Sequence, residues 1–104
     1  MRVRWNNRSK SQLRRVIHYL HCEFGYRKAS EFLRDIQHLN KLLSQNPYMG
    51  KPEPLLADLH SGYRSIVARY YNKIIYHIVD NNIEVVALWD TRREPVSQAK
   101  VLTE

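Results

Sequence analysis

The sequence predicts an α+β domain: a short strand, two helices and a three-stranded antiparallel meander, with the two-helix hairpin packed on one face of the sheet. Two observations predict this class. Apolar residues recur at helical spacing in the first half of the chain, and after residue 62 they form three short runs rich in Ile, Val, Tyr and Trp. With 104 residues and 43% hydrophobic content, we expect one domain over 1–104.

The first half of the chain predicts one strand and two helices. The run RVRW at 2–5 alternates basic and apolar residues, so its Val and Trp can face a core. Asn and Ser side chains that can cap a helix follow it, and the apolar stripe of this helix runs over 13–24 and stops at Gly25. A second stripe over 29–43 ends before Pro47, and the tight link predicts an antiparallel helical hairpin.

Three strands are expected in the second half, after a proline-rich connector that reads as extended. The connector covers 47–56, and the strands lie within 63–71, 73–79 and 83–89. Because the breaks between these runs are very short, the strands must pair as an antiparallel meander.

Two polar breaks predict the turns of this meander. DNN at 80–82 is a good tight-turn sequence, and Asn72-Lys73 can close the preceding hairpin. Side chains alternate along a strand, so Lys73 and His77 point away from the residues expected on the helix-covered face, which are Ile74, Tyr76 and Ile78. We expect no cover from this chain on the second face, which is solvated, occupied by a partner, or the floor of a site.

The positive charge is concentrated near the N-terminus. Residues 1–28 contain eight Lys and Arg residues and one acid, Glu23, whereas the rest of the chain is neutral. This segment is the electrostatic footprint expected for a polyanion or an acidic protein partner, and it is equally compatible with a well-solvated basic helix face.

Several classes of protein are disfavoured by the composition. No apolar stretch is long enough to span a membrane, the N-terminus lacks a signal-peptide core, and the single cysteine favours a reducing compartment, so we expect a cytoplasmic protein. His18, His21 and Cys22 have a spacing that can hold a metal, but no fourth ligand follows. Without a glycine-rich phosphate loop, the sequence predicts no cofactor and no metal.

Cations can converge on the second face of the sheet. Lys73 faces this side, and Arg64 and Arg69 have opposite parities in the preceding strand, so only one of them can share it. Arg92 and Arg93 arrive at the end of the last strand. Phosphate clamping needs such a set of cations.

Cleavage of RNA through its own 2′-hydroxyl also needs a general base and a general acid. Candidates for proton transfer are His60, His77, Asp90 and Glu94. An unstacked base can lie on a tyrosine ring such as that of Tyr63. The alternative interpretation is that a histidine and scattered arginines on a sheet face are ordinary surface residues.

The whole chain resembles a toxin of the RelE/ParE superfamily from bacterial type II toxin–antitoxin modules. The resemblance is most specific in GYRSIVARYYNKIIYHIVDNNIEVVALWDTRREP, at 62–95. There, a YR pair opens one strand, IIY lies in the next, an acidic residue and Asn form the turn, and arginines close the last strand. The ending WDTRREP is more similar to ParE-like and plasmid-stabilisation members than to the ribonucleases.

The resemblance implies two alternative activities. RelE-like members cleave mRNA in the ribosome, and on their pattern Arg64, Lys73 and Arg93 fall at basic positions of the site, with His77 available for proton transfer. Arg69, Tyr63 and Arg92 would then contact nucleic acid. ParE-like members instead inhibit DNA gyrase and are not nucleases.

Two departures separate this chain from the ribonucleases. A lysine of their second strand corresponds to Ile66, and their C-terminal tyrosine falls near Ala99. Activity as an mRNA endoribonuclease is therefore one expectation, gyrase inhibition is the alternative, and a degenerate module that only binds its antitoxin is a third. In all three cases the resemblance implies a heteromeric complex with a small cognate antitoxin, which suits the basic N-terminal segment.

Overall fold

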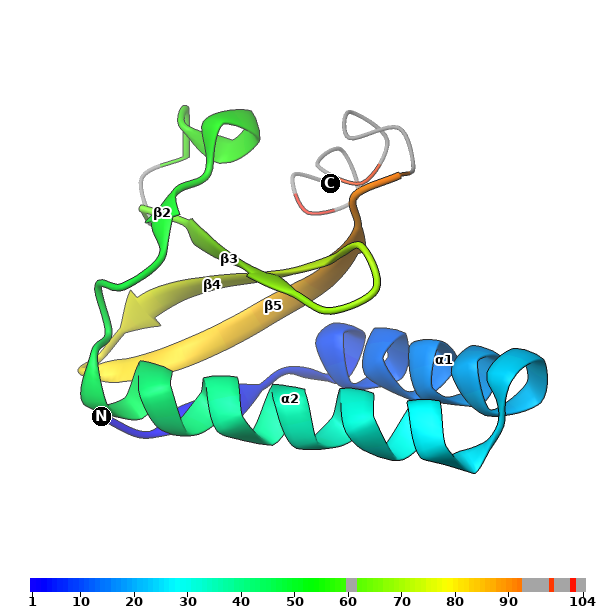
Figure 1. Ribbon diagram of the computed structural model, residues 1–104. Helices are drawn as coiled ribbons and strands as arrows, with labels where there is room; N and C mark the ends of the chain where they lie inside the picture. Colours follow the sequence, from blue (N-terminus) through cyan, green and yellow to red (C-terminus); the bar gives the residue numbers. More distant parts are fainter. Residues whose placement is uncertain (60–61, 93–97, 99–101, 103–104) are drawn as a thin grey trace.

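The computed structural model describes residues 1–59, 62–92, 98 and 102. Its elements are β1 (Val3–Trp5), α1 (Asn7–Phe24), α2 (Tyr26–Gln45), β2 (Lys51–Pro52), the 3₁₀ turn η1 (Pro54–Leu56), β3 (Arg64–Ala68), β4 (Asn72–Val79) and β5 (Asn82–Asp90). Both helices lie on one face of the sheet, and the connector that carries η1 lies on the other (Figure 1). The predicted α+β class and helical hairpin are confirmed.

The strands are ordered β1-β5-β4-β3-β2. β3, β4 and β5 form the predicted antiparallel meander. β1 joins the sheet in parallel beside β5, with Val3 opposite Ile83. The unpredicted strand β2 pairs with the start of β3; it has only two residues, one of them Pro52, which removes a backbone donor and gave no strand signal.

The helical hairpin forms where its capping residues predict. The side chain of Asn6 accepts a hydrogen bond from the Ser9 amide at 2.9 Å, and the buried Ser9 hydroxyl donates to the Val85 carbonyl at 2.9 Å. Gly25 links the helices at a φ of +92°, a conformation that L side chains rarely adopt. No helix in the described part of the chain is long and apolar enough to cross a membrane.

The turns of the meander use left-handed backbone conformations. Asp80 and Asn81 have φ values of +51° and +61°, which confirms the tight turn predicted at 80–82. The other predicted turn is wrong: Asn72 and Lys73 begin β4, and the chain reverses over 69–71. The Asn72 amide stabilises this turn from inside the strand, since it donates to the carbonyls of residues 69 and 70, each at 3.0 Å.

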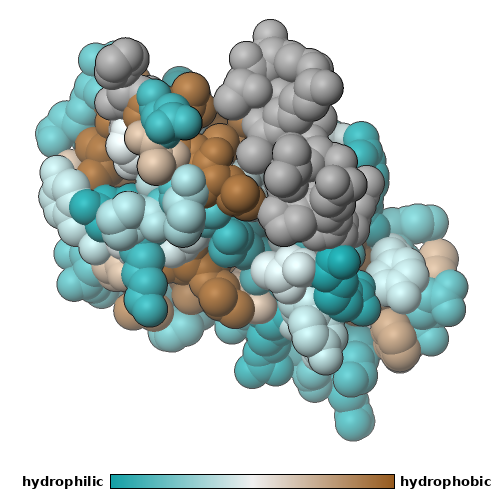
Figure 2. Space-filling view, turned by 90° about the horizontal axis from the view of Figure 1, so that it is seen from above, coloured by the Kyte–Doolittle hydropathy of each residue, from teal (hydrophilic) through white to brown (hydrophobic). Residues whose placement is uncertain are grey.

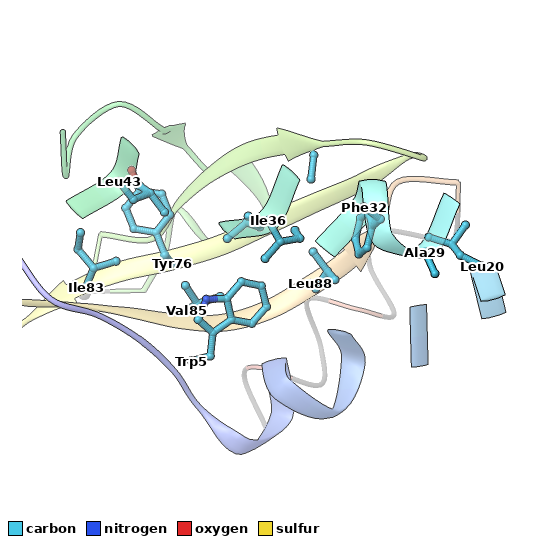
Figure 3. Close-up of a cluster of buried hydrophobic side chains, with 12 residues drawn as sticks. Trp5, Leu20, Ala29, Phe32, Ile36, Leu43, Tyr76, Ile83, Val85 and Leu88 are labelled. Atoms are coloured by element: carbon cyan, nitrogen blue, oxygen red, sulfur yellow. The ribbon is translucent and has the colours of Figure 1, made fainter. Parts of the chain in front are cut away.

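The main core lies between the sheet and the helices. Trp5 of β1, Phe32 and Ile36 of α2, and Tyr76 and Val85 of the central strands are among its buried members (Figure 3). Ile74 belongs to the same core and Ile78 packs against it, which confirms the predicted helix-covered face. Burial of one such large side chain contributes roughly 2 to 3 kcal/mol to folding.

A second, smaller core lies on the opposite face of the sheet. The connector was expected to be extended and to leave this face uncovered, but it turns at η1 and places Leu56, which is 2% exposed, against Ile75, Ala87 and Trp89. The physical reason is that Pro54 starts the turn and Glu53 caps it, its carboxylate accepting from the Leu55 amide at 3.4 Å. The cover is partial, because Val67 of β3 remains 74% exposed.

Candidate functional site

Two of the sequence-predicted site residues, Lys73 and His77, lie on β4 and face away from the helices, as their alternation with Ile74 and Tyr76 predicts. We call that side, where the connector packs, the connector face. Apolar surface gathers over the connector there, whereas the part of the hairpin that projects beyond the sheet is mainly hydrophilic (Figure 2). The connector therefore covers part of this face.

The ammonium group of Lys73 is held by a buried carboxylate. Its Nζ lies 2.8 Å from Oε2 of Glu53, a residue that is 2% exposed, and 5.3 Å from the centroid of the Trp89 ring. Burial tends to raise the pKa of Glu53, but hydrogen bonds from Lys73 and Ser65 and the charge of Lys73 outweigh it and hold that pKa below its ordinary value. Lys73 is thus already neutralised by the start of η1.

His77 belongs to a chain of polar contacts across the sheet. Its Nε2 lies 2.8 Å from Oε1 of Glu84, and the other oxygen of that carboxylate accepts from Arg4 at 3.1 Å. The hydrogen bond with His77 is the largest of the causes that lower the pKa of Glu84. An ionised carboxylate only accepts, so the proton is on Nε2.

The other faces of the His77 ring are enclosed. The ring stacks on Tyr63 with 4.5 Å between centroids and an interplanar angle of 11°. Nδ1 is buried with no hydrogen-bond partner among the described residues, and His77 is only 7% exposed. A general base must reach its substrate, and neither nitrogen of this ring is free to do so in this arrangement.

Arg64 does not join Lys73 and His77. It pairs across the ladder with Tyr76, and directly opposed residues share one face, so it lies on the helix side. There it holds the segment that follows α2: its guanidinium donates to the Gly50 carbonyl at 2.7 Å and lies 5.2 Å from the centroid of the Tyr48 ring. The prediction that Arg64 shares a face with Lys73 and His77 is wrong. The register of β3 puts Arg64 opposite Tyr76, whose side chain points to the helix side.

Arg69 and Arg92 also lie apart from these two residues. β3 ends at Ala68, so Arg69 is in the turn, where its backbone and guanidinium contact Asp35 of α2 at 3.3 and 3.7 Å. Arg92 contacts Asp90 at 3.3 Å and covers the Tyr71 ring at 4.9 Å from its centroid. Of the predicted site residues, His60, Arg93 and Glu94 lie outside the described residues.

A sequence model of the family described as "ParE toxin of type II toxin-antitoxin system, parDE" matches residues 3–95. The chain belongs to this family. It is similar in structure to the chromosomal ParDE system of P. aeruginosa, with a TM-score of 0.69, 18% identity, and coverage of 85% of this chain and 92% of that one. Among curated protein sequences, none matches this ParE-family chain significantly.

Two further solved structures have the same fold. The YoeB/ParE toxin of Agrobacterium tumefaciens aligns with a TM-score of 0.57, 20% identity, and coverage of 85% of this chain and 95% of that one. The YoeB–YefM complex of Staphylococcus aureus aligns with a TM-score of 0.53, 20% identity, and coverage of 85% and 93%. The family match identifies the chain as a ParE-type toxin of a type II toxin–antitoxin system, and the two YoeB structures show that it shares their fold.

Two acids of the ParE-family site were missed from the sequence. Glu84 could have been predicted from the sequence, because a two-residue turn at 80–81 places it directly opposite His77. Glu53 had no such signal, since it lies in a proline-rich connector far from β4 in sequence. In α1, Sγ of Cys22 lies 3.6 Å from Nε2 of His18. The described residues contain no cluster of three or more side chains suited to hold a metal.

Proposed function

We propose that this ParE-family toxin acts by binding DNA gyrase and inhibiting it, without cleaving nucleic acid. The observation that carries the proposal is that Lys73, Arg64 and His77, the described residues among those expected to form a nuclease site, all have partners within the chain. Lys73 is paired with Glu53, Arg64 lies on the helix side, and His77 is enclosed by Glu84 and Tyr63. A nuclease needs cations and an acid–base group that are free to meet the substrate, whereas an inhibitor needs only a complementary surface.

The proposal is tested by a supercoiling assay with the purified full chain, DNA gyrase and relaxed plasmid. We expect supercoiling to fall as toxin is added. The double variant Glu53→Gln/Lys73→Met removes both members of the pair, so it leaves no unpaired buried charge, and we expect it to inhibit as the parent does. Normal supercoiling at a large molar excess of folded toxin would contradict the proposal.

The second candidate function is cleavage of mRNA on the ribosome. It is favoured by one observation, that Lys73 and the stacked rings of His77 and Tyr63 share the connector face. Cleavage is tested by primer extension on mRNA after induced expression of the chain. New 5′ ends in phase with codons, lost in His77→Gln, would establish this function in place of gyrase inhibition.

Both candidate functions place the protein in the cytoplasm, and in both a small cognate antitoxin neutralises it in a heteromeric complex. The third alternative is a degenerate module that only binds its antitoxin. It predicts normal growth when the chain is expressed alone. Growth arrest on such expression, relieved by the antitoxin, would exclude it and would leave the supercoiling and primer-extension assays to identify the target.

A further inference from the structure

One pair of side chains on α1 takes no part in the candidate site or in the proposed function. His18 and Cys22 are both exposed, and Nε2 of the imidazole lies 3.6 Å from Sγ of the thiol. Residues four apart are neighbours on one side of a helix, so the two donor atoms face the same patch of solvent. The outer surface of α1 therefore presents one nitrogen and one sulfur atom side by side.

The distance between these two atoms is the one that a tetrahedral zinc ion requires. Zinc binds a cysteine sulfur at about 2.3 Å and a histidine nitrogen at about 2.0 to 2.1 Å. With a tetrahedral angle between the two bonds, the sulfur and the nitrogen lie about 3.5 to 3.6 Å apart. In the metal-free chain the same distance accommodates a weak S–H···N hydrogen bond, and zinc takes the place of its proton.

One chain supplies only half of such a site. Among the described residues, no group of three or more His, Cys, Asp or Glu side chains is placed to hold a metal. Structural zinc sites have four protein ligands, and two cysteines with two histidines are a common set. A second copy of this chain, related by a two-fold axis beside α1, supplies the missing histidine and cysteine. The two thiolates then balance the charge of the ion.

The surface around the pair offers contact area to a second copy. Phe24 ends α1 and Tyr26 begins α2, at the end of the hairpin that projects past the strands (Figure 1). These two residues are 57% and 77% exposed, and Tyr19, whose ring meets that of Phe24 edge to face, is 51% exposed. Exposed aromatic side chains are the type that contributes most to protein interfaces.

The charge of this region makes the metal necessary for association. Residues 1–28 contain eight Lys and Arg residues and one acid, so two copies that approach each other along α1 repel one another. The exposed rings alone must overcome this repulsion, whereas zinc adds four bonds at the centre of the contact. We therefore expect the chain to be a monomer without zinc.

We propose that His18 and Cys22 form one half of a zinc site, which the same two residues of a second copy complete. The product is a pair of toxin chains joined through α1 by one Zn²⁺ ion with two sulfur and two nitrogen ligands. Binding of the ion releases the two thiol protons to solvent. The inference goes beyond the proposed function and does not depend on the cellular target.

The test is titration of the reduced full chain with zinc chloride, followed by analytical ultracentrifugation. We expect the mass to double at about 0.5 zinc ions per chain and to return to that of the monomer with EDTA. X-ray absorption should show equal numbers of sulfur atoms at about 2.3 Å and nitrogen atoms at about 2.0 Å. Cobalt chloride should produce the intense visible absorption of a tetrahedral thiolate site.

Three variants assign the ligands. Cys22→Ser and His18→Gln should each weaken zinc binding roughly 100-fold or more and abolish the zinc-dependent dimer. The matched control His21→Gln removes the neighbouring exposed histidine of the same helix and should change zinc affinity less than about two-fold. Because all three side chains are exposed, circular dichroism should show that the variants fold as the parent does.

Four results would overturn the inference. The first is no zinc uptake by the reduced, folded chain, which would leave the contact as a hydrogen bond only. The second is uptake of one ion per chain without dimerisation, and the third is an equal loss of affinity in the matched control. The fourth is a dimer that persists in EDTA and is dissolved by a reductant, which would be a disulfide between two copies of Cys22.

Discussion

On the helix side of the sheet, two helices of 18 and 20 residues cover the strands, whereas on the connector face a three-residue turn does so. The helix side is sealed by apolar side chains such as Phe32 and Ile36, which are 0% and 1% exposed. The connector face combines one buried leucine with a polar fastening, the pair between Glu53 and Lys73. The difference indicates that the helix side provides most of the stability, while the connector face keeps polar groups beside the candidate site.

The largest expected effect tests the helix side against the connector face directly. Phe32→Ala removes a fully buried ring from the main core and should lower the free energy of unfolding by about 4 kcal/mol. Leu56→Ala removes a side chain from a short turn that can relax toward the sheet, and should cost about 2 kcal/mol. Urea denaturation followed by circular dichroism measures both. Equal losses would contradict the asymmetry between the two covers.

A smaller effect concerns the polar fastening of the connector. Glu53→Gln leaves the Lys73 ammonium without its acid and should cost about 2 kcal/mol at about pH 7, less than for a fully buried pair because Lys73 is partly exposed. Restoring neutrality in Glu53→Gln/Lys73→Met should recover part of that loss, since no unpaired charge remains. A double-mutant cycle in urea measures the coupling, and additive single effects would show that the pair does not fasten the connector.

The same pair predicts a pH dependence. The pKa of Glu53 is lowered in the folded state, so its contribution is complete above its ordinary value of 4.5 and is lost as the pH falls through the folded pKa. The difference in unfolding free energy between the parent and Glu53→Gln should therefore narrow below about pH 4.5. Denaturation curves at several pH values measure it, and a constant difference would assign the effect of the variant to packing.

The smallest effect is expected at the exposed end of the polar chain across the sheet. The side chain of Arg4 is 74% exposed, so its contact with Glu84 is screened by solvent. Arg4→Gln should change the free energy of unfolding by less than about 0.5 kcal/mol. Urea denaturation measures this change. If Arg4→Gln lowered the free energy of unfolding as much as Glu53→Gln does, the exposed pair of Arg4 and Glu84 would stabilise the sheet as much as the buried pair of Glu53 and Lys73.

The accuracy of the sequence-based predictions follows the range of the interactions involved. The helices, the strands other than β2 and the turn at 80–82 were predicted because local spacing and local side chains specify them. The turn was predicted at Asn72-Lys73, but it lies at 69–71. It was missed because two consecutive tyrosines, which adopt φ values of +57° and +63°, give no turn signal. There the Asn72 amide, acting from within the strand, replaces the usual turn residues.

The candidate site was predicted less completely than the fold. Alternation within β4 correctly placed Lys73 and His77 on one face, but the phase of β3 depends on its register, which put Arg64 on the other. Glu53 reaches Lys73 through a fold of the connector that no local pattern specifies. The positive charge of residues 1–28 was visible in the sequence, but the pairing of Arg4 with Glu84 required the structure.

The parallel pairing of β1 with β5 has a consequence for the order in which the protein can assemble during translation. The strands bring together Arg4 and Glu84, which are 80 residues apart, and the amide of Asn6 donates to the carbonyl of Val85. A ribosome therefore delivers the first strand long before its neighbour exists, and β5 lies between β1 and β4 in the finished sheet. A nascent chain that stops before β5 has no site for its own N-terminal strand, so β1 can join the sheet only after β5 has been synthesised.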